Sequence, residues 1–263
     1  MERQTLGGIL KELWTFRVYL KYETLGKIKL RHKGTYLGYL WWVLDPLFLL
    51  AIYYFMFKIV LRHGRPNYVL FLFCALLPWR WFSTSASEAT LAIRSSAGLI
   101  KQVYFPKIIA PLATIFTNTV NFAAGLLILA LLMALHKVPL HWSLVCFPLI
   151  ALIQLIFTVG VGLILADIDV YARDTESLMR HVLNFWFYLS PGLYSIDMVP
   201  ERLRLIFAMN PFTTFFEAYR DICMYGRWPN FAHLGLWLLL SLGLMFFGAM
   251  RMARHQGDYA KVI

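Results

Sequence analysis

Six predominantly apolar segments alternate with shorter polar stretches along this chain. They cover residues 39–61, 68–87, 108–135, 142–166, 182–195 and 231–250. A helix needs about 20 apolar residues to cross a hydrocarbon core roughly 30 Å thick. Only residues 182–195, a run of 14 before polar Asp197, fall clearly short and would need flanking residues to cross. The pattern predicts an all-α integral membrane protein with six transmembrane helices.

Composition supports a membrane protein. Hydrophobic residues make up 60% of the 263-residue chain and charged residues 15%, against about 45–50% and about 25% in soluble domains. A soluble chain of this size cannot bury that much apolar surface, which excludes a soluble enzyme and a disordered chain. The three cysteines are far apart and form no zinc or disulfide pattern. The first 37 residues show no features of a cleaved signal peptide.

The distribution of basic residues predicts the orientation. With six spans, sixteen lysines and arginines fall on the face that holds both termini and seven on the other face. Basic residues concentrate on the cytoplasmic side of membrane proteins. We therefore expect a multi-pass protein of the bacterial cytoplasmic (inner) membrane with both termini in the cytoplasm. The net charge of +11 does not indicate nucleic acid, because no basic run is interleaved with aromatic residues.

Residues 1–37 precede the first span and contain an apolar stripe at helical spacing. Its members are Leu6, Ile9, Leu10, Leu13, Phe16 and Leu20. This pattern predicts an amphipathic helix in the cytoplasmic membrane interface. A helix packed on the rest of the protein would give the same pattern.

The segment between the last two spans, residues 198–225, is apolar and aromatic but contains two prolines and several charges. A straight lipid-facing helix is disfavoured by Pro211 and by the charges of Glu217, Arg220 and Asp221. Two short helices broken at Asn210-Pro211, entering the outer leaflet and returning, satisfy the backbone better. A hairpin outside the membrane is the alternative.

Catalytic motifs are absent from the sequence, with one arguable exception. There is no GxxxxGK[ST], HExxH or GxSxG pattern. Asp167 and Asp169 could hold Mg²⁺ in a membrane-bound prenyl- or glycosyltransferase, but no second acidic cluster accompanies them. We expect no metal site and no cofactor in this chain, and a structural role for these acids.

Four stretches in order resemble the membrane subunits of ABC-2 type exporters, specifically the polysaccharide, O-antigen and teichoic-acid export permeases. The first stretch comprises Arg31, residues 36–41 and Asp45-Pro46. The remaining three comprise residues 77–82 with 99–107 and 111–112, residues 171–174 with 189–194, and residues 210–212 with 217–220. The resemblance extends over residues 31–220 on the six-span plan.

The resemblance implies a homodimer bound to two copies of a separate ABC ATPase, which would supply ATP and Mg²⁺. The substrate would be a lipid-linked glycan moved from the cytoplasm across the membrane. We expect a cytoplasmic N-terminal segment (1–37), a six-span domain (38–250) and a cytoplasmic tail (251–263). An ABC-2 permease for a drug or lipid is the main alternative, and the transferase is the other.

A substrate pathway for sugars would offer aromatic planes to their C–H faces and polar groups to their rims. Trp42, Asp45 and Tyr53 share one face of the first span at about 100° per residue, although Trp42 also suits an interfacial belt. Arg80, well inside span two, requires water, a carboxylate or an anionic substrate. Trp186 and Tyr188 in the short span complete these candidates.

Three further groups of candidates follow from position and from the resemblance. Lys27, Lys29, Arg31 and Lys33 would attract either the diphosphate of a lipid carrier or anionic lipid headgroups. Residues 95–106 and 173–179 are each expected to form a short helix, with the first coupling to the ATPase. The coupling candidates are Leu99, Lys101, Gln102, Tyr104, Phe105, Arg173 and Asp174. Asn210, Pro211, Glu217 and Arg220 are candidates for an outer gate, with a Glu217–Arg220 ion pair at i,i+3 spacing.

Overall fold

The computed structural model describes residues 6–34, 36–60 and 67–262 and is all-helical over them. The elements are α1 (Leu6–Thr15), α2 (Arg17–His32), η1 (Gly38–Leu40), α3 (Trp41–Tyr54), η2 (Phe55–Val60), α4 (Tyr68–Ser95), α5 (Ala97–Gln102), α6 (Ile109–Leu135), η3 (Trp142–Cys146), α7 (Phe147–Tyr171), α8 (Thr175–Leu189), η4 (Ile196–Met198), α9 (Glu201–Ala208), α10 (Pro211–Arg220), η5 (Asp221–Tyr225) and α11 (Phe231–Val262). The predicted fold class, an all-α protein of apolar helices, is confirmed at this level.

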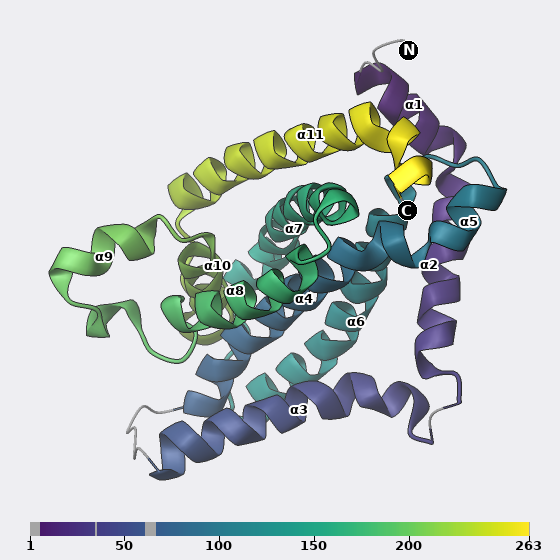
Figure 1. The fold of residues 1–263 in the computed structure, drawn as a ribbon. Coiled ribbons are helices and arrows are strands. Elements are labelled where there is room, and N and C mark those ends of the chain that lie inside the picture. Colours follow the sequence, from purple (N-terminus) through teal and green to yellow (C-terminus); the bar gives the residue numbers. More distant parts are fainter. Residues whose placement is uncertain (1–5, 35, 61–66, 263) are drawn as a thin grey trace.

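Four helical segments are long and apolar enough to cross a membrane. They are Tyr68–Gln102, Ile109–Leu135, Trp142–Tyr171 and Phe231–Tyr259. In Figure 1, α11 and α3 lie on opposite sides of the bundle, with α4, α6, α7, α8 and α10 between them. Helix α2 runs along one end of the bundle, where α1, α5 and the end of α11 also lie.

Several helices extend beyond their predicted ends. Span two was expected to end at residue 87, but α4 continues to Ser95, because Glu88 and Arg94 have charged partners on other helices. Helix α11 likewise continues past residue 250 to Val262. Leu61, the expected end of span one, lies outside the described residues.

The sequence predicted a short helix at residues 173–179 that is separate from the short span at residues 182–195. This prediction was wrong. A single helix, α8, runs from Thr175 to Leu189. No glycine or proline interrupts these residues, and Ser190 is extended ahead of Pro191, as the steric restriction before proline requires. The predicted coupling helix 95–106 is also shorter than expected, since α5 ends at Gln102 and Val103 is extended.

Helix α11 packs along α7 in the most extensive helix pair of the fold. Close approach is possible because Gly160 of α7 has no side chain. A Cβ there would lie 2.7 Å from the backbone nitrogen of Met245 and 2.9 Å from the Leu244 carbonyl carbon. Small residues at such crossings allow membrane helices to gain backbone packing.

Two hydrophobic clusters form the interior. The larger one is centred on aromatic rings of α4, α7, α8 and α10. Phe212 lies 4.6 Å from Phe82 and 4.7 Å from Trp79 between ring centroids. The smaller cluster lies near α5 and includes Phe105, Ile109 and Tyr259.

Three of the six residues of the predicted apolar stripe in the N-terminal segment pack on protein. Leu13, Phe16 and Leu20 contact the smaller cluster, while the side chains of Leu6, Ile9 and Leu10 lie outside the described residues. A second apolar stripe is exposed instead, formed by Trp14, Val18, Tyr22 and Leu25. We therefore expect these four residues to face the membrane interface.

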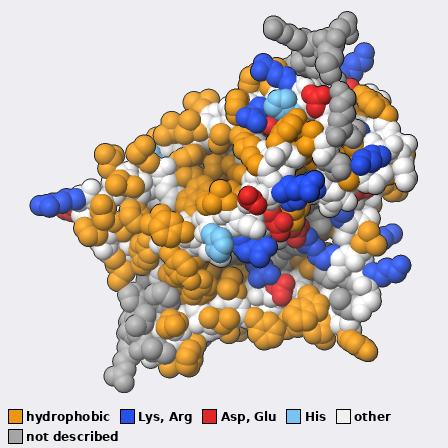
Figure 2. Space-filling view, viewed as in Figure 1, with side chains coloured by type: hydrophobic (Ala, Val, Ile, Leu, Met, Phe, Trp, Pro, Cys, Tyr) orange, Lys and Arg blue, Asp and Glu red, His pale blue; other side chains and the backbone are white. Residues whose placement is uncertain are grey.

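Charged side chains are unevenly distributed over the surface. Figure 2 shows hydrophobic side chains over most of the visible face. Lysines, arginines and acids extend from its centre toward the end that holds α1, α5 and the last turns of α11, and a separate basic group projects at the opposite end. This is the arrangement that a membrane-embedded body with one polar end requires.

Candidate functional site: a charged aromatic pocket within the helical bundle

A pocket of about 350 Å³ lies between α2, α3, α4 and α6. Its lining combines aromatic, charged and amide side chains: Arg31, Trp41, Trp42, Asp45, Pro46, Leu77, Arg80, Trp81, Thr84, Glu88, Asn118, Asn121, Phe122 and Gly125. Trp42, Asp45 and Arg80, which the sequence predicts for the substrate pathway, meet here. So does Arg31, which the sequence groups with the lipid-headgroup candidates.

Arg80 is paired with Asp45 inside this pocket. Its Nη2 donates to Asp45 Oδ2 at 2.8 Å, and both side chains stay partly exposed, at 37% and 45%. Arg80 lies about 18 Å along α4 from Tyr68 by helix rise, a depth at which an unpaired cation costs several kcal/mol. The sequence allowed water, a carboxylate or an anionic substrate as the partner of Arg80. The structure shows a carboxylate, that of Asp45.

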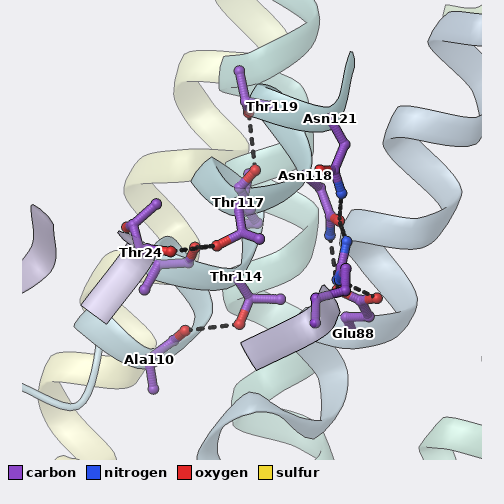
Figure 3. A network of polar contacts seen from close by, with 11 residues as sticks. Thr24, Glu88, Ala110, Thr114, Thr117, Asn118, Thr119 and Asn121 are labelled. Carbon is purple, nitrogen blue, oxygen red and sulfur yellow. Dashed lines mark hydrogen bonds and ion pairs between the residues drawn. The ribbon is translucent and has the colours of Figure 1, made fainter. Parts of the chain in front are cut away.

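A second ion pair fastens the N-terminal helices to the bundle. Arg31 Nη2 donates to Glu88 Oε1 at 2.7 Å, and Arg31 Nη1 donates to Asn118 Oδ1 at 2.8 Å. Asn118 Nδ2 in turn donates to Glu88 Oε2 at 2.9 Å. Figure 3 shows Glu88, Asn118 and Asn121 directed toward one another beside α2. Arg31 therefore differs from exposed Lys29 and Lys33, which remain candidates for lipid headgroups, as does Lys27 beside Glu23.

The structure does not bring the other pathway candidates to this pocket. Trp186 belongs to the aromatic core, 5.4 Å from Phe212 between ring centroids, and its Nε1 donates to Asn210 Oδ1 at 3.1 Å. Tyr53 packs against Phe187 at 5.7 Å, and Tyr188 is 58% exposed. Their assignment to a pathway stays a prediction.

Helix α5 and the residues just after it present four of the seven coupling candidates on the surface. Leu99, Lys101, Gln102 and Tyr104 are exposed. Phe105 differs, because it is 3% exposed and packs 5.3 Å from the ring of Tyr19 in α2. Phe105 therefore anchors the segment on α2, and its part in coupling stays a prediction.

Lys107 shares this anchored segment. Its ammonium lies 4.7 Å from the ring centroid of Phe105, and burial lowers the pKa of Lys107 from its ordinary value. Burial also raises the pKa of Tyr104, with a further contribution from nearby Glu12.

Asp167 and Asp169 lie at the same end of α7 and are both fully buried. Asp167 accepts from Arg251 Nη2 at 2.7 Å, His255 Nδ1 at 2.8 Å and Tyr259 Oη at 2.6 Å, all in α11. The two acids are directed to different partners, and no group of three potential metal ligands occurs among the described residues. This arrangement fits a structural role and does not favour the transferase reading.

Asp169 links α7 to the end of α4, which directly precedes α5. Arg94, one residue before the end of α4, donates to it from both Nε and Nη2. Arg94 also lies 3.7 Å from Glu176 of α8, near the exposed coupling candidates Arg173 and Asp174. The end of α7 is therefore tied to α11 through one carboxylate and to α4 and α8 through the other.

The outer-gate candidates hold α10 against the bundle. Asn210 caps α10 by accepting from the backbone nitrogen of Phe212 at 3.0 Å, and Pro211 occupies the first turn. The predicted break at Asn210-Pro211 is confirmed. Helix α9 is largely exposed and α10 largely buried, so the two halves of residues 198–225 have different surroundings.

Arg220 is 3% exposed and bonded to backbone. It donates to the carbonyl oxygens of Pro191 and Gly192 at 2.7 and 2.6 Å, and its Cζ lies 3.5 Å from the centroid of the Phe71 ring. The proposed pairing with Glu217, which is partly exposed, stays a prediction. Arg220 joins α10 to the turn after α8 and to the start of α4.

Sequence reasoning missed the polar residues that complete the pocket. Neither Glu88, just after span two, nor Asn118 and Asn121 within the apolar segment 108–135 was singled out from the sequence. The spacing of Asn118 and Asn121 could have indicated a polar surface, because amides three residues apart share one face of a helix. Polar side chains inside a membrane span generally mark a functional or packing surface.

These observations define a multi-pass membrane protein with a pocket lined by charged, amide and aromatic side chains. The chain belongs to the ABC-2 type transporter family, whose model matches residues 21–224. It is 33% identical to the O-antigen export system permease protein RfbA of Myxococcus xanthus over 258 residues, or 97% of this chain and 99% of that protein.

Two further relatives extend the comparison. A protein of the same name from Klebsiella pneumoniae is 33% identical over 85% of this chain and 88% of its own length. The polysialic acid transport protein KpsM of Escherichia coli is 22% identical over 85% of this chain and 88% of its own length. The resemblance found in the sequence is confirmed.

Proposed function

We propose that this chain is the membrane subunit of an ATP-driven exporter that moves a lipid-linked polysaccharide, of O-antigen, capsule or teichoic-acid type, out of the cytoplasm. The observation that supports it most is the match, over nearly the whole of both chains, to a permease named for O-antigen export. The pocket adds physical support, because it offers tryptophan rings and polar groups within a membrane-embedded bundle.

The proposed topology has six crossings and both termini in the cytoplasm. Beyond the four long helical segments, α3 and η2 together comprise 20 residues, Trp41–Val60, or about 30 Å of helix. Helix α8 is shorter, with 15 residues, and would complete its crossing through the turn that Arg220 binds. In this proposal α9 and α10 form the re-entrant element in the outer leaflet.

Energy would come from a separate ATPase, as two copies bound to a homodimer of this chain. The exposed surface of α5 would meet the ATPase. Arg94, just before this surface in the chain, forms an ion pair with buried Asp169 of α7. Asp167, also in α7, forms an ion pair with Arg251 of α11. A displacement of α5 would therefore reach α4, α7, α8 and α11 through rigid ion pairs.

Deletion of the gene in its host tests the function. The expected result is loss of surface polysaccharide with accumulation of the lipid-linked glycan inside the cell. Complementation with wild-type chain restores export, Arg80→Gln restores it poorly, and the exposed control Arg204→Gln restores it fully. An unchanged surface glycan, together with new sensitivity to apolar drugs, would instead support the drug-permease alternative.

A further inference from the structure

The pocket between α2, α3, α4 and α6 has no net charge among its lining residues. Arg31 and Arg80 are its cations, and Glu88 and Asp45 are its anions. Each cation already faces an anion, at 2.7 Å for Arg31 and Glu88 and 2.8 Å for Arg80 and Asp45. A phosphate would approach arginines that are already paired, and it would be repelled by the two carboxylates that pair with them. The electrostatics favour an uncharged polar ligand.

One acceptor in the pocket is left without a donor. Asn121 Oδ1 is buried and accepts no hydrogen bond from any described residue. Its neighbour Asn118 already has partners, since its oxygen accepts from Arg31 and, at 3.5 Å, from Asn121 Nδ2, and its nitrogen donates to Glu88. A buried acceptor without a partner is unfavourable, so a ligand hydroxyl that donates to Asn121 Oδ1 would remove this penalty.

Rigid aromatic planes border the same space. Trp81 stacks on Phe122 with ring centroids 4.3 Å apart, and its Nε1 donates to Thr119 Oγ1 at 3.2 Å. Trp41 and Trp42 line the pocket from α3. Apolar planes beside hydroxyl-binding amides and carboxylates match a sugar ring, which has C–H faces and a hydroxyl rim.

We propose that this pocket binds an uncharged sugar ring of a membrane-anchored glycolipid, with a sugar hydroxyl donating to Asn121, and that the phosphate of such a lipid lies elsewhere. The inference rests on the proposed function, because it assigns the sugar portion of the exported lipid to this pocket. Its volume, about 350 Å³, is at the small end of ligand pockets, so it accommodates a short sugar unit and not a polymer coil. Exposed Lys29 and Lys33 remain available to a phosphate.

Photolabelling in nanodiscs tests the inference. The probe is a decyl glucoside with a diazirine in its alkyl chain, and the competitors are unlabelled decyl glucoside and decyl phosphate. We expect labelled peptides from α3 and α6, competition by the glucoside, and at least a tenfold weaker competition by the phosphate. Equal competition by the phosphate would overturn the inference.

A variant at the orphaned acceptor separates binding from folding. Asn121→Leu should reduce competable labelling at least fivefold with little change in the melting temperature, because it removes an unsatisfied oxygen together with only one long hydrogen bond, 3.5 Å from Nδ2 to Asn118. Ser241→Ala is the matched control, since Ser241 Oγ is also buried without a described partner and does not line the pocket. Wild-type labelling in Asn121→Leu would contradict the proposal.

A further competition identifies the source of the sugar, and the two proposals can fail separately. A diacylglycerol glucoside and an isoprenyl-diphosphate-linked sugar are compared as competitors, and competition by either supports the inference. Failure of both, in cells that still export glycan, would remove the inference alone. The opposite outcome is also possible. If the purified chain is still labelled but deletion of its gene leaves glycan export unchanged, the proposed function is wrong and the sugar site remains.

Discussion

The pairing of Arg94 with Asp169 gives a quantitative test of how the polar end of the molecule is held together. Asp169 is fully buried, and the Arg94 side chain is 25% exposed. Removal of one partner from a buried pair generally costs about 3–5 kcal/mol, because the remaining charge is left without compensation. We expect Arg94→Met to approach the upper part of this range, because the Asp169 carboxylate would then lose both of its Arg94 donors.

Asp169→Leu should cost less, about 3 kcal/mol, because Arg94 is partly exposed and still lies 3.7 Å from Glu176. The double variant Arg94→Met/Asp169→Leu replaces the pair by apolar side chains and should recover most of the loss. The free energy of unfolding is measured by SDS titration in detergent with far-UV circular dichroism.

The matched control is the exposed pair of Arg204 and Glu201, at 3.7 Å with side chains 48% and 87% exposed. Arg204→Met should change the free energy of unfolding by less than about 1 kcal/mol. If the Arg94 and Asp169 variants cost no more than this control, or if their effects simply add in the double variant, the buried pair is not the link described above.

Three further predictions address packing, the outer element and coupling. Gly160→Ala should lower the free energy of unfolding by about 1–3 kcal/mol, because its Cβ would meet the α11 backbone; an unchanged value would show that α11 can shift. Arg220→Ala should impair export of surface glycan while the ATPase still co-purifies, because two buried carbonyls lose their donor; wild-type export would remove Arg220 from the gate. Lys101→Glu should weaken co-purification of the ATPase without lowering the melting temperature, whereas Phe105→Ala should lower the melting temperature because Phe105 is buried; the opposite pattern would contradict the assignment of α5.

Periodicity and length were sufficient for the helices that end at clear breaks. Helix α6 begins within one residue of its predicted start and ends where predicted, because polar residues and prolines flank a long apolar run. Helix α4 continues past the predicted end of span two, because the sequence shows where the apolar run ends and not where the helix ends. Only the folded chain shows that Glu88 and Arg94 are neutralised by residues distant in sequence.

The candidate site was predicted in part for the same reason. Asp45 and Arg80 were each recognisable as costly inside a membrane, but their pairing depends on α3 lying beside α4 in space. Trp186 was indistinguishable from a pathway residue in the sequence, and packing places it in the aromatic core. Asn121 is significant only because the structure leaves its buried oxygen without a described donor.

Reconstitution tests the central claim most directly. The chain is co-reconstituted with its ATPase into liposomes that contain the lipid-linked glycan, and exposure of the glycan on the face opposite the ATPase is measured with a glycan-binding lectin. The account predicts exposure that requires both subunits and ATP hydrolysis. Exposure at the same rate without the ATPase, or none under hydrolysis by an intact complex, would contradict it.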